Sequence, residues 1–398
     1  MSVAVADMNE VSRFWPAILA CFATAVFGWG FGFSGPSVYL AELHRLQGWP
    51  NGLISSAITA YYLAGAVCLG WVHVALRRLG PRLLLAAGVI VLGLGATAFS
   101  RSVAPWQLFC AACVMAVGWA GCTSTAISTS LAVYFRQRRG LAITLALNGA
   151  STAGFTVGPL LVVLSQQIGL RTAVPSIAIG GLLIVLPLIW FGFRAPGDDM
   201  EEVRAAPTPA AELLRRWDFW AVALPFALAL AAQVGLIVHL VSFLLPTLGP
   251  AGSATGLALT SVAAVTGRLG LAAVIDRLPQ RPAACASFAS QALGLLLMLT
   301  MSDVPVALYG GCLLFGLSVG NVITYPALII QREFPAAEFA AVIGLSTAVG
   351  QFTYSLAPAL LGVIRDAAGS YGPVLMVCMA LQVCGAVLVL WLRRRRPG

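Results

Sequence analysis

The chain has very little charge and no lysine at all. Of its 398 residues only 9% are charged, whereas 60% are hydrophobic, and the mean hydropathy is +0.92. Soluble domains average about 25% charged residues. A soluble fold of this length cannot bury so much apolar sequence, so the composition excludes soluble enzymes and predicts a membrane protein. All 23 basic residues are arginines, which we attribute to a G+C-rich genome.

Metal and redox motifs are also lacking. The nine cysteines all fall inside apolar runs, and the Cys110 and Cys113 pair has neither a second C-x-x-C nor a histidine cluster beside it. Small thiols buried in helices are the better interpretation, and we expect no metal and no cofactor. The first apolar run starts near Pro16 and is too long for a signal-peptide core, so no cleavable signal is predicted.

What the sequence has instead is a series of long apolar runs. A helix needs about 20 mainly apolar residues to cross the hydrocarbon core of a bilayer. Twelve runs meet this length, near 15–41, 51–75, 82–100, 105–134, 140–165, 172–193, 218–246, 253–275, 282–301, 305–331, 338–363 and 371–392. After the sixth run comes a polar stretch with the Pro, Gly and acidic composition of a linker.

These runs predict an all-α membrane protein with twelve transmembrane helices in two pseudo-symmetric six-helix bundles. We expect bundles at 1–193 and 218–398, joined by a cytoplasmic linker at 194–217. Gly154–Leu161 in the fifth run is weakly similar to Tyr354–Leu361 in the eleventh, about half the chain later. Internal repeats of this kind are typical of secondary transporters.

Arginine placement predicts the orientation, because cytoplasmic loops carry an excess of basic residues. With a cytoplasmic N-terminus, only four arginines fall outside, at Arg45, Arg101, Arg171 and Arg365. The 18 on the cytoplasmic side are Arg13, Arg77, Arg78, Arg82, Arg136, Arg138, Arg139, Arg194, Arg204, Arg215, Arg216, Arg277, Arg281, Arg332 and Arg393–Arg396. We therefore expect both termini in the cytoplasm of a bacterial cell and the chain in its inner membrane. The net charge of +9 is mostly this asymmetry, and no nucleic-acid partner is needed to explain it.

The one arginine left over, Arg268, lies inside the apolar run 254–275. An ionisable residue at such a position is costly and is by default a functional-site hypothesis. A guanidinium can hold a carboxylate through two parallel hydrogen bonds, so an unpaired Arg268 predicts a small anionic substrate. Alternatively, its side chain extends to the cytoplasm, or pairs with Asp276 or a helix-end carbonyl. Asp276 is eight residues further on, about 12 Å along a helix, which is long for a direct pair.

Other polar residues inside the runs are candidates for the lining of a substrate cavity. They are Tyr61, Tyr62, Asn148, Asn321, Tyr325, Gln351 and Tyr354. Asn321 and Tyr325 are four residues apart and share a helix face. Gln351 and Tyr354 are three apart, with the same consequence. For each residue alone, an interhelical hydrogen bond or plain packing is the more common role in helical bundles.

No acidic residue lies well inside a run, although a proton-driven carrier usually has a titratable carboxylate or histidine in its path. His239 and Glu42 are weak candidates for coupling. An interhelical histidine and a solvated rim pair of Glu42 with His44 are the alternatives. Facilitated flux, anion exchange and proton co-transport through the substrate's own carboxyl group all remain open.

Three segments carry motifs. They are Phe27–Pro36 followed by Trp49, Ser55, Tyr61 and Tyr62; Tyr134–Ala142 followed by Ala146–Gly149; and Gly267–Gly270 followed by Asp276 and Arg277. Over its whole length the chain resembles the major facilitator superfamily, and within it the branch of monocarboxylate transporters and oxalate/formate antiporters. The resemblance implies a transporter that is not an enzyme, with Arg268 as its anion-binding residue.

The chain also departs from this pattern. His73 and Arg77 replace the Gly and Asp of the superfamily's loop between the second and third helices. Ala264 stands where monocarboxylate transporters often have an Asp, and the eleventh run lacks the Lys of oxalate carriers. One buried cation instead of two implies a monoanion rather than a dianion.

We therefore predict an alternating-access carrier of a small organic anion, a monocarboxylate, which we expect to be a monomer in the lipid bilayer. An efflux transporter for drugs or metabolites in the same superfamily is the main alternative, but export of cations would require buried acids, which are missing. A membrane-embedded transferase would require converging acids or a His-acid pair, and we find none. A receptor or scaffold has no positive support.

Overall fold

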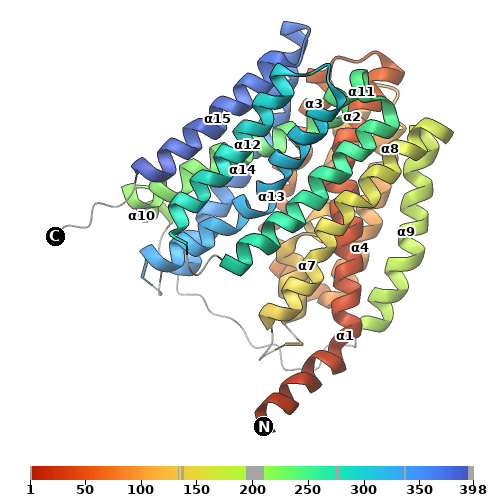
Figure 1. Cartoon of the computed structure of the whole chain (residues 1–398). Helices are drawn as coiled ribbons and strands as arrows, with labels where there is room; N and C mark the ends of the chain where they lie inside the picture. The colour runs from red at the N-terminus through yellow and green to blue at the C-terminus, as the bar shows by residue number, and fades with distance from the viewer. Residues whose placement is uncertain are drawn as a thin grey trace. The chain divides into compact units, whose positions relative to one another are not determined.

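The computed structural model describes residues 2–132, 134–135, 139–193, 210–274, 278–335 and 338–392. Within these ranges the chain forms helices and no β-strand, which confirms the predicted all-α class (Figure 1). Residues 194–209, most of the predicted linker, lie outside the described part. Contacts between Cα atoms group the chain into two units, Met1–Trp49 with Ala60–Glu202, and Pro50–Thr59 with Val203–Gly398.

The first unit contains most of the helices of the N-terminal half. They are α1 (Ser2–Trp29), the π-helix η1 (Gly30–Ser34), α2 (Gly35–Gln47), α3 (Asn51–Leu69), α4 (Val72–Ser100), α5 (Pro105–Ala120), α6 (Ser124–Ala132), α7 (Arg139–Phe155), α8 (Val157–Ile168) and α9 (Leu170–Gly192). Several follow one another without leaving the apolar run, so that Phe14–Gln47, Pro105–Ala132 and Leu141–Ile168 each form one long segment.

The second unit contains α10 (Ala210–Leu213), α11 (Trp217–Val274), α12 (Gln280–Thr300), α13 (Pro305–Glu333), α14 (Phe339–Ala368) and α15 (Gly372–Trp391). A straight helix of the 58 residues in α11 would be about 87 Å long, far more than the roughly 30 Å hydrocarbon core. Gly249 interrupts it with a left-handed backbone (φ 66°), which glycine adopts without steric cost, and Pro250 follows. Thus α11 holds two membrane-crossing segments.

This break explains why the structure has fewer membrane-crossing segments than the sequence has apolar runs. Among the described residues, eleven segments are long and apolar enough to cross a membrane, and one of them is Trp217–Leu271. Counting that segment as two gives the twelve crossings that the apolar runs predict.

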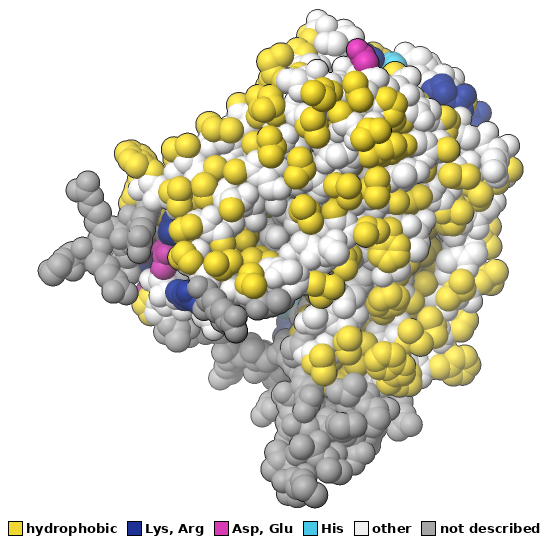
Figure 2. All heavy atoms as spheres, in the orientation of Figure 1, with side chains coloured by type: hydrophobic (Ala, Val, Ile, Leu, Met, Phe, Trp, Pro, Cys, Tyr) yellow, Lys and Arg dark blue, Asp and Glu magenta, His cyan; other side chains and the backbone are white. Residues whose placement is uncertain are grey.

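The surface is that of a membrane protein. In Figure 2, hydrophobic side chains are spread over the whole described face in view, and the few charged side chains lie near its margins. Six tryptophans are about half or more exposed, and all lie near the ends of apolar segments: Trp15, Trp71, Trp106, Trp190, Trp217 and Trp391. Tryptophan prefers the membrane–water interface, where its ring is half in lipid and its N–H in water.

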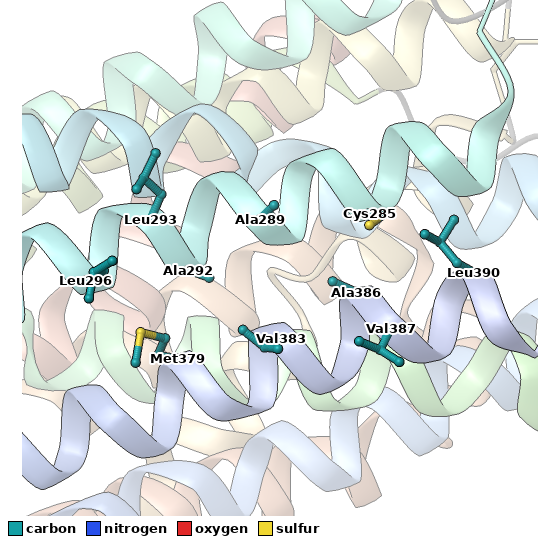
Figure 3. A pocket seen from close by; sticks show the side chains of 10 residues that line it. All are labelled: Cys285, Ala289, Ala292, Leu293, Leu296, Met379, Val383, Ala386, Val387 and Leu390. Atoms are coloured by element: carbon teal, nitrogen blue, oxygen red, sulfur yellow. The ribbon is translucent and has the colours of Figure 1, made fainter.

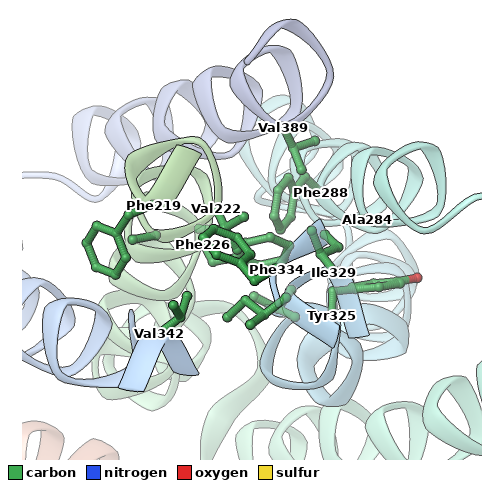
Figure 4. Close-up of a cluster of buried hydrophobic side chains, with 14 of the residues drawn as sticks. Phe219, Val222, Phe226, Ala284, Phe288, Tyr325, Ile329, Phe334, Val342 and Val389 are labelled. Carbon is green, nitrogen blue, oxygen red and sulfur yellow. The ribbon is translucent and has the colours of Figure 1, made fainter. Parts of the chain in front are cut away.

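Aromatic side chains fill the core of the second unit (Figure 4). Phe226 of α11 packs edge-on against Phe288 of α12, with ring centroids 5.3 Å apart. Tyr325 of α13 lies 6.5 Å from Phe226 by the same measure. All three are nearly inaccessible, so this cluster joins α11, α12 and α13.

One buried arginine ties four helices of this unit together. Arg281 of α12 donates to both carboxylate oxygens of Glu333 on α13, at 2.8 and 2.7 Å. Its Nη1 donates to the carbonyls of Val389 on α15 and Ala221 on α11, at 2.9 and 3.2 Å. Each of the three guanidinium nitrogens therefore has an acceptor, and these contacts offset the desolvation cost of the buried charge.

The second unit also includes the first turns of α3. The carboxylate of Asp366 on α14 accepts hydrogen bonds from the backbone N–H groups of Asn51 and Gly52, at 3.2 and 2.6 Å. The Asn51 amide donates to it as well, at 3.2 Å. A carboxylate is favourable at a helix N-terminus, where unpaired N–H groups point outward, so Asp366 caps α3.

Candidate functional site

Two helices of the second unit approach until their backbones touch. A Cβ atom placed on Gly267 of α11 would lie 1.8 Å from the carbonyl oxygen of Leu317 on α13. One placed on Gly316 of α13 would lie 2.5 Å from the carbonyl oxygen of Thr260 on α11. Only glycine fits at either position, as in other close helix contacts within membranes.

Arg268 follows Gly267 directly and therefore lies at this contact. Its Nε and Nη2 are packed against Gly320 of α13, where an added Cβ would be 2.7 and 2.9 Å from them. The Nε atom is buried and has no hydrogen-bond acceptor. Within the described part of the chain no carboxylate lies within 4.0 Å of the guanidinium. Asp276, the alternative partner, lies outside the described residues.

A second unsatisfied polar atom belongs to the residue next to Gly320. Asn321 is 6% exposed, and its Nδ2 donates to the Leu317 carbonyl at 3.2 Å. Its Oδ1 has no partner. Unpaired buried polar atoms are uncommon, because each costs about 1–3 kcal/mol. An arginine donor and an amide acceptor are therefore both unsatisfied where α11 meets α13.

Tyr325 shares the α13 face with Asn321 by spacing, but the structure gives it other neighbours. Its hydroxyl lies 3.2 Å from Oγ of Ser287 on α12, and its ring belongs to the aromatic core. These contacts favour the packing alternative for Tyr325.

The two candidates on α14 are partly exposed. The Gln351 carbonyl accepts a hydrogen bond from Ser355 at 2.6 Å, and no described contact joins the Gln351 side chain to Arg268. Tyr354 lies one turn further along the same helix.

His239 of α11 is fully buried, with both ring nitrogens near partners. Nε2 lies 3.1 Å from the Pro358 carbonyl on α14, and Nδ1 lies 3.4 Å from the Tyr371 hydroxyl. Burial raises the pKa of Tyr371 to about 12, so its hydroxyl stays protonated at neutral pH and can donate to Nδ1. With Nε2–H donating to the carbonyl, a neutral His239 satisfies both contacts, as an interhelical histidine does.

In the first unit, Tyr61 and Tyr62 are buried within an aromatic cluster. Their rings lie 4.8 Å apart, and Tyr61 is also in edge contact with Trp119, which in turn contacts Trp29 at 5.0 Å. Asn148 of α7 is exposed instead and does not join this cluster. The structure thus brings the two tyrosines together but not the asparagine.

Glu42 is buried rather than solvated at the rim. Its Oε2 accepts hydrogen bonds from Nε and Nη2 of Arg45 at 3.2 and 2.7 Å, and its Oε1 accepts one from Gln166 of α8. His44, the partner considered from sequence, bonds the Trp49 carbonyl at 2.7 Å. This pairing favours a structural role for Glu42.

Sequence reasoning missed a buried chain of three amides. Gln291 of α12 donates to Gln233 of α11 at 2.9 Å, and Gln382 of α15 donates to Gln291 at 2.5 Å. All three side chains are completely buried. The only available signal was the occurrence of amides in apolar runs, which does not say that they meet.

One hollow in the second unit is apolar. It has a volume of about 450 Å³ and lies between α12 and α15, lined only by apolar side chains and Cys285 (Figure 3). None of its lining residues is a candidate site residue, and such a surface suits hydrocarbon rather than an anion. Among the described residues no three His, Cys, Asp or Glu side chains are grouped to hold a metal ion.

Comparisons with known proteins agree with this architecture. The family model of the Major Facilitator Superfamily matches residues 20–358. The uncharacterized MFS-type transporter YhhS of Salmonella paratyphi C is 28% identical over 63% of this chain, and the match covers only 58% of that relative. Monocarboxylate transporter 13 of Bos taurus is 25% identical over 79% of this chain and 74% of its own length.

Solved structures show the same fold. The crystal structure of the nucleoside transporter NupG superposes with a TM-score of 0.77 over 94% of this chain and 98% of that one. At 11% sequence identity, this similarity concerns the fold alone.

The contacts of Tyr325 give a test of its role. Tyr325→Phe should lower the free energy of unfolding by about 0.5–1.5 kcal/mol, because one buried hydrogen bond is lost. Ser287→Ala should have a similar effect, and the double variant should be less than additive. Thermal unfolding of the detergent-purified variants measures this. A Tyr325→Phe protein of unchanged stability but altered ligand binding would place Tyr325 in the site instead.

Proposed function

The chain belongs to the major facilitator superfamily, whose members are transporters and not enzymes, and we propose that it is a secondary transporter that carries a small organic anion held by Arg268. The observation that supports this is the guanidinium on α11, which has an unsatisfied Nε and no carboxylate within 4.0 Å among the described residues. A permanent cation in an apolar segment needs an anion, and the cargo can supply it.

A monocarboxylate is the proposed substrate class. Arg268, the intramembrane cation with an unsatisfied donor, matches one negative charge, and the bovine relative named as a monocarboxylate transporter supports the same class. We propose that Asn321 contacts the rest of the substrate, because its free Oδ1 lies on the residue after Gly320. Tyr61, Tyr62, Asn148, Gln351 and Tyr354 remain candidates for the wider lining.

We further propose that both termini are cytoplasmic in a bacterial inner membrane, from the arginine asymmetry. A C-terminal fusion to green fluorescent protein, which becomes fluorescent only in the cytoplasm, should then glow. The matching fusion to alkaline phosphatase should be inactive. The reverse pair of results would invert the orientation.

Ligand class can be tested directly. Thermal unfolding of the purified protein would be measured with acetate, propionate, pyruvate and benzoate, with the dianions oxalate and succinate, and with tetraphenylphosphonium. We expect stabilisation by monocarboxylates alone. Stabilisation by the lipophilic cation alone would instead support efflux of amphipathic compounds.

Arg268 itself can be replaced. Losing two charge-assisted hydrogen bonds of about 1.5–3 kcal/mol each predicts that Arg268→Ala weakens monocarboxylate binding at least tenfold. Arg268→Lys should weaken it less, because the charge stays while the planar donor pair is lost. Binding is measured by titration of purified protein. Arg171→Ala, at an exposed arginine, is the matched control and should bind normally. Unchanged binding by Arg268→Ala would exclude the proposed role.

Coupling can be followed through pH. Exchange of labelled monocarboxylate across reconstituted vesicles would be compared between about pH 5 and 8 for the wild type, His239→Gln and Glu42→Gln. We expect Glu42→Gln to leave the pH profile unchanged, because Arg45 and Gln166 already occupy this carboxylate. A profile abolished by His239→Gln would assign coupling to α11. A profile abolished by Glu42→Gln alone, with exchange intact, would show that Glu42 carries the proton.

A further inference from the structure

The two glycines that α13 presents to α11 differ in what they contact. A side chain at Gly316 would collide with backbone atoms, the carbonyl oxygen and Cα of Thr260 at 2.5 and 2.9 Å. A side chain at Gly320 would meet first the Nε and Nη2 atoms of Arg268, and only then the Ala264 carbonyl at 3.0 Å. Gly316 therefore sets the distance between the helices, whereas Gly320 faces the guanidinium.

The atoms nearest to Gly320 form one particular edge of the guanidinium. Nε–H and one Nη2–H point in parallel and are one of the donor pairs through which arginine binds a carboxylate with two hydrogen bonds. Nε is buried against α13 and has no acceptor among the described residues. A methyl group at residue 320 would overlap this edge and push the side chain away.

We propose that Gly320 is a positioning residue for substrate binding: its missing side chain lets the Arg268 guanidinium lie with its Nε–Nη2 edge against α13, so that the Nη1–Nη2 edge is the donor pair left for the anion. The proposal rests on the proposed function, since it concerns how Arg268 is held and presented to the anion. Asn321 supports it independently, because this 6%-exposed amide has an unpaired Oδ1 beside the same position.

The proposed role of Gly320 depends on the planar shape of the guanidinium and not only on its charge. An ammonium group on a flexible stem is a point donor and needs no planar edge. After replacement of Arg268 by lysine, anion binding should therefore depend much less on whether residue 320 is glycine. A purely structural role of Gly320 in helix packing would instead affect both backgrounds to the same extent.

The test is a double-mutant cycle on the full-length purified protein, with acetate, propionate, pyruvate and benzoate as probes. Gly320→Ala should weaken binding of the best probe at least about fivefold when Arg268 is present. In the Arg268→Lys background the same change should weaken it less than about twofold. Gly310→Ala on the same helix is the control, because its Cβ would only touch the end of the Leu297 side chain, at 3.3 Å.

Unfolding temperatures without ligand complete the experiment. Gly320→Ala should melt close to Gly310→Ala, because the two nearest atoms belong to the flexible end of the Arg268 side chain, and the Ala264 carbonyl, at 3.0 Å, is a tight contact but not an overlap. Full binding by Gly320→Ala, together with weak binding by Arg268→Ala, would overturn this inference and leave the proposed function standing. Equal losses in both Arg268 backgrounds would overturn it in favour of helix packing. Full binding by Arg268→Ala, or no binding of any probe by the wild type, would overturn the proposed function and the inference with it.

Discussion

The backbone contact between α11 and α13 is the constraint on which the candidate site depends. Gly267 and Gly316 let the two helices touch, and the next residue along α11 is Arg268. Its long side chain therefore lies along α13 rather than extending freely, with Gly320 beneath it. In a membrane, where apolar helices gain little from hiding from water, such close packing is a main source of helix association. The same contact that stabilises the unit thus determines where the cation lies.

The buried polar groups of the second unit fall into two kinds. Arg281 has a carboxylate and two backbone carbonyls as partners, and the three glutamines Gln233, Gln291 and Gln382 bond to one another. Arg268 and Asn321 keep an unsatisfied donor and acceptor. Satisfied groups stabilise helix contacts, while an unsatisfied buried pair is tolerated only at a cost. This difference between Arg281 and Arg268, which lie in the same unit, is why we propose a structural role for the first and substrate binding for the second.

Hydropathy predicts much of this fold, because the bilayer imposes a fixed length on every crossing segment. Arg268 was likewise visible as a charge with no acid near it in its apolar run. The packing of Tyr325 against α12 cannot be predicted from the sequence, because a helix face shared with Asn321 does not indicate which neighbouring helix each residue contacts. The roles of Gly320 and of the glutamine chain depend on contacts between helices far apart in sequence. The runs 218–246 and 253–275 predict a connector between them, whereas in the structure α11 is helical on both sides of Gly249 and only this residue breaks it.

The exposed tryptophans have a consequence for spectroscopy. Six of the ten indoles lie near the ends of apolar segments and are about half or more exposed, while Trp29 and Trp119 pack edge-on inside the first unit. The intrinsic emission of the protein will therefore be dominated by rings at the depth of lipid headgroups. The emission wavelength, and the quenching by brominated acyl chains, will report the depth of these six tryptophans in a given bilayer. They will therefore report how well the bilayer thickness matches the length of the twelve segments.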